Sequence, residues 1–329
     1  MKTVQRLGIA AACVAIAASC ALVGCNRQAG ASKQYKIAGI ILKEDEFFKL
    51  VQTGMEQAAK EQGVDLQMNT SNTLDKEVEL INTCTTSGVD AIVIAPQSKE
   101  SSAKALQAAA AKGIKVVCAN TPIDADFVVS DIESDAVDLG TETGKAAVKF
   151  INEKLGGKAN IAIIAFDDQL PEQSKARTKG FVDEVSKLPG VKIVAHQDAN
   201  MADKAQAQAS AIVTAHPEVN IFWSANEGGT VGSVLAVKEL HKEGKMFVFG
   251  TDASDQLIGF LESPDNILQA ITSQKPVDVG RMSVEYAVKA LKGEKVEKSV
   301  IMKGILLSRD DAAGVADFKK KLAAWKAGG

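Results

Sequence analysis

The feature that most constrains the fold is a regular alternation of short apolar runs with longer amphipathic stretches. The runs have the length of strands and are apolar almost throughout, which suits parallel strands covered on both faces. They lie at residues 36–42, 91–95, 115–119, 161–166, 220–225 and 246–250. The stretches with helical spacing lie near residues 47–62, 75–88, 99–112, 138–155, 173–187, 203–215, 229–243 and 255–262. This alternation predicts an α/β fold of doubly wound parallel sheets.

Residues at the ends of the amphipathic stretches support the helix assignment. Ser71-Asn72-Thr73 and Asp198-Ala199-Asn200 have the composition of helix starts. Glycine follows several stretches, as in Gln62-Gly63, Ser87-Gly88 and Lys112-Gly113, which is typical of helix ends.

The pattern divides into two series of similar rhythm, and about 300 residues exceed what one hydrophobic core supports. We therefore expect two lobes. Candidate crossings lie after Val128-Val129-Ser130-Asp131, at Ser273-Gln274-Lys275-Pro276 and near Lys303-Gly304. If the chain crosses between the lobes at all three places, a three-crossing hinge joins the lobes. Each lobe is then discontinuous in sequence. The predicted bounds are residues 35–134 plus 275–304 for the N-terminal lobe and 135–274 plus 305–329 for the C-terminal lobe.

The first residues of the chain have the features of an export signal. Lys2 and Arg6 form a basic start, and an apolar run over residues 7–23 follows. The run ends in Leu22-Val23-Gly24-Cys25, which resembles a bacterial lipobox. The resemblance implies removal of residues 1–24 and lipidation of Cys25, with residues 25–34 as a tether. An ordinary secretory signal and an uncleaved anchor are the alternatives.

Charge and cysteine content narrow the partners. The formal net charge is −3, and removal of the signal takes two positive charges away. A mildly acidic chain is not expected to bind nucleic acid, which requires clustered lysine and arginine. Cys84 and Cys118 are the cysteines left after Cys25, and two buried free thiols are favoured over a disulfide. The three histidines are dispersed, so neither a metal site nor a cofactor is expected.

Polar side chains follow each of the six apolar runs. Ligands of open parallel sheets bind outside the carboxyl ends of the strands, so these positions are candidate contacts. Asparagine and aspartate also form turns and helix caps, but six such ends on two facing lobes favour a binding cleft. The segments are Lys43-Glu44-Asp45-Glu46-Phe47-Phe48, Pro96-Gln97-Ser98, Asn120-Thr121-Pro122, Asp167-Asp168-Gln169, Asn226-Glu227 and Thr251-Asp252.

The types of residue in these segments indicate the class of ligand. Carboxylate, amide and guanidinium groups can each engage neighbouring hydroxyl groups, through hydrogen bonds worth about 1.5–3 kcal/mol where one partner is charged. The C–H face of a sugar packs against aromatic rings, which Phe47-Phe48 can supply, although such a pair is also common in a core. Trp223 lies within an apolar run and is expected to be a core residue that borders the cleft. A small sugar or polyol fits this pattern.

Several short motifs occur in a specific order between about Tyr35 and Lys320. They are Phe47-Phe48, Ser134-Asp135, Arg177-Thr178-Lys179-Gly180-Phe181, Thr214-Ala215-His216-Pro217-Glu218-Val219, Asn226-Glu227, Gly250-Thr251-Asp252 and Gln274. In this order the chain resembles the ribose- and arabinose-type periplasmic sugar-binding proteins of ABC transporters, which have the type I periplasmic binding protein fold. Carried over position by position, the resemblance implies ligand contacts at Lys43, Asp45, Phe47, Phe48, Asn120, Arg177, Asn226, Asp252 and Gln274.

The chain also departs from the ribose-type pattern. Thr251 and Met201 stand where ribose-type members have aromatic residues, Ala95 replaces an asparagine, and Asn120 replaces an aspartate. Fewer aromatic faces argue against ribose itself. A polyol, another pentose or hexose, or a hydroxylated signal molecule remains open.

These observations favour an extracytoplasmic, lipid-anchored solute receptor, expected to be a monomer, that delivers its ligand to an ABC permease. The alternative is a chemosensory or quorum-signal receptor on the same scaffold, which would require a sensor partner. Neighbouring genes for a permease and ATPase, or for a histidine kinase, would separate the two. An enzyme is not expected, because the sequence has no nucleophile elbow and no nucleotide-type glycine fingerprint.

Overall fold

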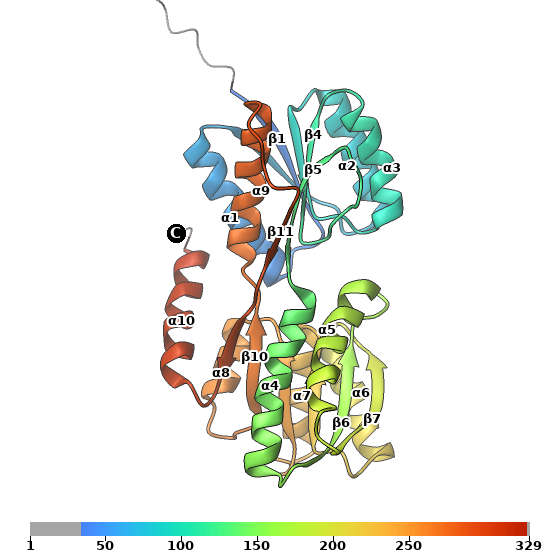
Figure 1. Cartoon of the computed structure of the whole chain (residues 1–329), viewed down its shortest axis with the longest axis vertical. Helices are drawn as coiled ribbons and strands as arrows, with labels where there is room; N and C mark the ends of the chain where they lie inside the picture. The colour runs from blue at the N-terminus through green and yellow to red at the C-terminus, as the bar shows by residue number, and fades with distance from the viewer. Residues whose placement is uncertain (1–33, 328–329) are drawn as a thin grey trace, which may run out of the picture. The chain divides into compact units, whose positions relative to one another are not determined.

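The strands and helices follow one another in the predicted alternation (Figure 1). The structure is a computed structural model and describes residues 34–327. The expected signal peptide, the lipidated Cys25 and the tether as far as residue 33 lie outside the described residues. From Tyr35 onward the chain belongs to one structural unit.

The strands form two sheets of six strands each, in the orders β11-β5-β4-β3-β1-β2 and β12-β10-β9-β8-β6-β7. The two sheets are parallel as predicted, apart from one edge pair: β10 and β12 pair antiparallel. The strands are β1 Lys36–Ile41, β2 Asp65–Thr70, β3 Ala91–Ile94, β4 Lys115–Ala119, β5 Val128–Ser134, β6 Lys158–Ala165, β7 Gly190–Asp198, β8 Ile221–Ser224, β9 Phe247–Thr251, β10 Leu268–Ser273, β11 Ser299–Met302 and β12 Ile305–Ser308.

Helices cover both faces of each sheet. Helices α1 and α9 pack against each other beside the first sheet, and α4 and α5 do the same beside the second. The bounds are α1 Glu46–Gln62, α2 Leu74–Ser87, α3 Lys99–Ala110, α4 Ala136–Lys154, α5 Pro171–Val185, α6 Ala202–Ala215, α7 Glu227–Glu239, α8 Asp255–Glu262, α9 Pro276–Leu291 and α10 Ala312–Lys326.

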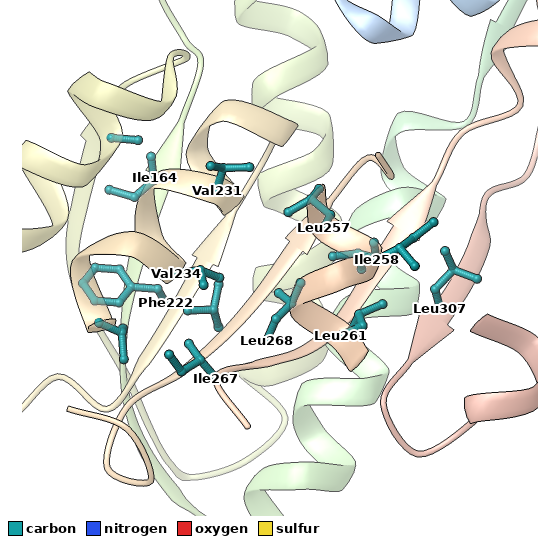
Figure 2. Close-up of a cluster of buried hydrophobic side chains, with 14 of the residues drawn as sticks. Ile164, Phe222, Val231, Val234, Leu257, Ile258, Leu261, Ile267, Leu268 and Leu307 are labelled. Carbon is teal, nitrogen blue, oxygen red and sulfur yellow. The ribbon is translucent and has the colours of Figure 1, made fainter. Parts of the chain in front are cut away.

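The continuous apolarity of the central strands follows from burial on both sides. Successive side chains of a strand point to opposite faces. Ile221 and Trp223 of β8 therefore belong to the core cluster on the α4 and α5 side, while Phe222 belongs to the cluster on the opposite face. Figure 2 shows this second cluster, in which Phe222 lies beside Val234 of α7. Both layers thus exclude water from the sheet.

Trp223 is a core residue that does not line the cavity described below, so the expectation that it borders the cleft was wrong. Its side chain is fully buried and stacks on Phe181 at a centroid distance of 4.7 Å. Its indole N–H donates to Thr143 Oγ1 at 3.0 Å. The apolar ring and the indole N–H therefore both have partners inside the second lobe.

The chain crosses between the two sheets three times (Figure 1). β5 of the first sheet is followed by α4, which packs on the second sheet. β10 of the second sheet is followed by α9, which packs on the first. β11 and β12 then place the last two strands in different sheets.

Of the two helix starts that the sequence indicated, one has the expected cap and one does not. Thr73 caps α2 as expected and accepts a hydrogen bond from the Lys76 N–H. Helix α6 begins at Ala202, close to the predicted start, but the residue before it is Met201, which forms no side-chain cap, so the capping expected from Asp198-Ala199-Asn200 was wrong. Cys84 and Cys118 are buried and free, as expected.

Candidate functional site

A cavity of about 530 Å³ lies at the carboxyl ends of strands from both sheets. Its lining includes all nine residues at which the resemblance implies a ligand contact. These residues are Lys43, Asp45, Phe47, Phe48, Asn120, Arg177, Asn226, Asp252 and Gln274. The fold thus brings together side chains that are far apart in the sequence.

The segment after β1 forms one wall of the cavity. Asp45 caps α1, because its Oδ1 accepts from the Phe48 N–H at 2.9 Å. Its other carboxylate oxygen pairs with Lys43 Nζ at 2.9 Å. The rings of Phe47 and Phe48 meet edge to face, with centroids 5.0 Å apart. This wall therefore combines an aromatic surface with a carboxylate whose charge Lys43 already neutralises.

Asp252 is the centre of the polar network on the opposite wall. It follows β9 in a left-handed conformation with φ 71°. Its Oδ1 accepts from Gln274 Nε2 at 2.6 Å, and its Oδ2 accepts from the Glu227 N–H at 3.0 Å. Oδ2 also lies 3.5 Å from the Arg177 guanidinium. One carboxylate thus ties together residues from α5, α7 and the segment after β10.

Arg177 is a buried cation whose charge faces the cavity wall. Its Nη1 donates to the Ala225 carbonyl at 2.8 Å, and its guanidinium carbon lies 5.1 Å from the centroid of the Phe166 ring. Burial lowers the pKa of Arg177, and the nearby Asp252 opposes this shift. The buried Nε has no hydrogen-bond partner within the described residues.

Asn226 and Asn120 line the cavity and also form hydrogen bonds with neighbouring segments of the fold. Asn226 caps α7 through a hydrogen bond from the Gly229 N–H at 3.0 Å, and its Nδ2 donates to the Asn200 carbonyl at 2.9 Å. Asn120 has a left-handed φ of 68°, and its carbonyl accepts from Gln173 Nε2 at 2.9 Å. The last contact joins a residue after β4 of the first sheet to a helix of the second lobe.

Two ion pairs also connect the lobes. Lys99 at the start of α3 pairs with Glu172 at the start of α5. Lys326 near the end of α10 pairs with Glu46 at the start of α1, at 2.7 Å. The cavity is thus flanked by polar contacts that water can replace, which is compatible with movement of one lobe against the other.

The contacts implied by the resemblance leave out several residues that line the cavity: Gln169, Gln173, Asn200, Met201, Glu227 and Gln256. Gln169 and Glu227 follow β6 and β8 and stand in the strand-end segments that the sequence indicated. Asn200 and Met201 follow β7, which the sequence did not indicate. Gln173 and Gln256 lie in the first turns of α5 and α8, where only the three-dimensional arrangement directs them to the cavity.

Glu227 is an acid of the cavity wall whose pKa departs strongly from its ordinary value. Burial raises the pKa of Glu227 to about 7, a hydrogen bond with Ser254 lowers it, and the charges of Asp252, Glu46 and Asp45 raise it. Across residues 34–327 this carboxylate has no ion-pair partner. The group therefore changes its charge near neutral pH, where most carboxylates are fully ionised.

Within residues 34–327, no group of three or more histidine, cysteine or acidic side chains could hold a metal ion. In the same part of the chain, no helix is long and apolar enough to cross a membrane.

Two curated relatives match most of the chain. The ABC transporter periplasmic-binding protein YphF of Escherichia coli is 28% identical over 278 residues, covering 81% of this chain and 84% of that protein. The ribose import binding protein RbsB of Bacillus subtilis is 24% identical over 274 residues, covering 82% and 86%.

A solved structure agrees with the arrangement of the two sheets. An ABC transporter solute binding protein from Bacillus halodurans, with bound myo-inositol, superposes with a TM-score of 0.80 at 22% identity. The match covers 89% of this chain and 99% of that one, and it confirms the predicted class of fold.

The family comparison extends over most of the described chain. The periplasmic binding protein domain family matches residues 40–295, which include all the cavity residues that the sequence predicted. This family consists of proteins that bind solutes for transport and are not enzymes, and it agrees with the extracytoplasmic location expected from the first residues. The chain belongs to the periplasmic binding protein domain family.

Proposed function

We propose that this protein captures a small sugar or polyol in the cavity between its lobes and delivers it to an ABC permease. The observation that carries the proposal is the cavity itself, in which Phe47 and Phe48 face a polar network built on Arg177 and Asp252. Aromatic rings cover the C–H face of such a ligand, while charged groups engage its hydroxyls. A volume of about 530 Å³ lies within the usual range for small-molecule sites.

The relatives support the same class of ligand. One is named for ribose import, and a solved neighbour holds myo-inositol, a cyclic polyol. Each of the predicted contact residues acts, in this proposal, as a donor, an acceptor or an apolar surface for the solute. Delivery to a permease follows from the ABC transporter context of these relatives.

The three crossings serve as a hinge in this proposal. Each crossing is a short connection, so small changes in backbone angles can move one sheet relative to the other. Closure would bring the aromatic wall on α1 against Arg177 and exclude water from the solute. Exclusion of water strengthens each polar contact.

A panel of pentoses, hexoses and polyols tests the proposal by thermal shift. A true ligand at about 100 times its Kd stabilises the folded state by about 2.7 kcal/mol, which corresponds to about 5 °C in melting temperature. Calorimetry should then give one-to-one binding without turnover, and small-angle scattering should show a decrease in radius of gyration. If no sugar or polyol raises the melting temperature, this function is wrong.

We also propose that Cys25 carries the lipid that holds a monomeric receptor on the outer side of the membrane. Its support is the Leu22-Val23-Gly24-Cys25 motif. Cys25→Ser is expected to release the protein from the membrane fraction and to abolish incorporation of labelled palmitate. Cys118→Ser is the matched control, since its thiol is buried in the fold. Unchanged membrane attachment of Cys25→Ser would contradict the anchor.

A further inference from the structure

A small side pocket adjoins the main cavity. It measures about 20 Å³, enough for one group of the size of a water molecule or an ammonium. The side pocket and the cavity share the lining residues Phe47, Glu227, Asp252 and Gln274. A substituent of a ligand in the cavity can therefore enter the side pocket.

The polar lining of the side pocket includes one acceptor that has no donor. Gln274 is 4% exposed, and its Oε1 has no hydrogen-bond partner in the described residues. Its Nε2 is already committed to Asp252, so the free atom is an acceptor. The Glu227 carboxylate adds further acceptor capacity. A buried acceptor without a partner costs about 1–3 kcal/mol, which a donating ligand group would recover.

The charges around the cavity leave one carboxylate without a cation. Lys43 pairs with Asp45 at 2.9 Å, and Arg177 pairs with Asp252 at 3.5 Å. Glu227 is the remaining charged residue in the lining, and it has no basic partner. A ligand that brings one positive charge would balance this set.

We propose that the side pocket binds an ammonium group, so that the preferred solute is an aminated sugar or polyol held by Glu227 and Gln274. This inference rests on the proposed function and specifies its class of ligand. An ammonium supplies three donors and no acceptor, which matches the free atoms of the side pocket. The Phe47 ring beside it suits a cation as well.

The inference predicts a pH dependence with a definite sign. Glu227 faces Asp252 after β9 and Asp45 and Glu46 at the start of α1, and its pKa of about 7 reflects this acidic, buried setting. Arg177 and Lys43 compensate Asp252 and Asp45, and Lys326 of α10 compensates Glu46. Glu227 therefore gains its negative charge as the pH rises through about 7. Affinity for an aliphatic ammonium, which stays protonated to about pH 10, should rise in the same interval.

Matched pairs of probes test the inference by isothermal titration calorimetry. The pairs are 1-amino-1-deoxysorbitol with sorbitol and an amino-deoxy-inositol with myo-inositol. In a pair that binds, we expect the amine to bind about tenfold tighter than its hydroxyl parent at pH 8, because a charged partner strengthens the hydrogen bond. At pH 6 the preference should largely disappear.

Glu227→Gln should remove the preference for the amine and its pH dependence while the hydroxyl parent still binds. Glu44→Gln is the matched control, because it removes an exposed carboxylate close to Asp45 that does not line either pocket. The pH dependence of the unmodified protein provides a test that requires no variant to fold. Equal binding of amine and parent at pH 8, or a preference that survives in Glu227→Gln, would overturn the inference and leave the proposed function standing. Failure of every probe and of the wider sugar panel would overturn both.

Discussion

Asp252→Ala is expected to weaken solute binding by about 100-fold or more, one of the two largest effects that we predict. The carboxylate holds Gln274 Nε2, the Glu227 N–H and the Arg177 guanidinium in place. Its removal leaves a buried cation without a partner, which typically costs about 3–5 kcal/mol. Calorimetry with the solute found by thermal shift measures the loss, and urea denaturation measures the accompanying fall in stability.

Two further variants separate the local effect from general damage. Asp168→Ala removes an exposed aspartate that follows β6 of the same sheet and does not line the cavity, so the affinity should stay unchanged. Arg177→Ala should also weaken binding, and in combination with Asp252→Ala the two losses should not add, because the two residues share one ion pair. Wild-type affinity in both single variants would mean that the cavity is not the binding site.

The central strands could be predicted because burial on both faces requires apolar residues in succession. Edge strands have no such requirement. Every residue of β2 is at least partly exposed, and so is every residue of β7. Their sequences therefore mix polar and apolar residues without the continuous run that identified β3 or β8. The missed strands explain why Asn200 and Met201, which follow β7, were absent from the predicted site.

Asn120, Asn226 and Asp252 could be predicted because parallel strands end at one edge of the sheet, whatever their distance in the sequence. Arg177, which lies in α5, and Gln274 were implied by the resemblance alone. The hydrogen bonds and the charge state of each of these side chains could not be predicted. Asp45 is committed to a helix cap and to Lys43, whereas Glu227 has no cation at all. Both are acids beside a strand end in the sequence. Only the surrounding burial and charge make one of them a neutralised cap and the other a titrating group.

The close packing of α4 and α5 likewise depends on the structure. Gly140 of α4 faces the Arg177 carbonyl of α5, and Gly180 of α5 faces the Val137 carbonyl of α4. Reciprocal glycines let the two backbones meet without intervening side chains. The Arg177-Thr178-Lys179-Gly180-Phe181 motif thus joins a cavity residue to the helix contact that positions it.

Gly140→Ala should lower the free energy of unfolding by about 3 kcal/mol and weaken solute binding as well. The added Cβ would overlap the Arg177 carbonyl oxygen and lie 2.8 Å from the Phe181 nitrogen. Both neighbours are backbone atoms in a helix, so neither can turn aside, and α5 must move away from α4. That movement displaces Arg177 from Asp252. Urea denaturation measures the stability, and calorimetry at a temperature where the variant is folded measures the affinity.

Gly259→Ala provides the control for this substitution. Gly259 lies within α8, and an added Cβ would meet no atom within 4 Å. Alanine favours the helix over glycine by about 1 kcal/mol, so this variant should be slightly more stable and bind as before. Opposite signs for the same chemical change would show that contact between backbones, and not helix propensity, determines the effect at Gly140. If Gly140→Ala is as stable as the wild type, the helices have room to adjust, and α5 does not depend on this contact to position Arg177.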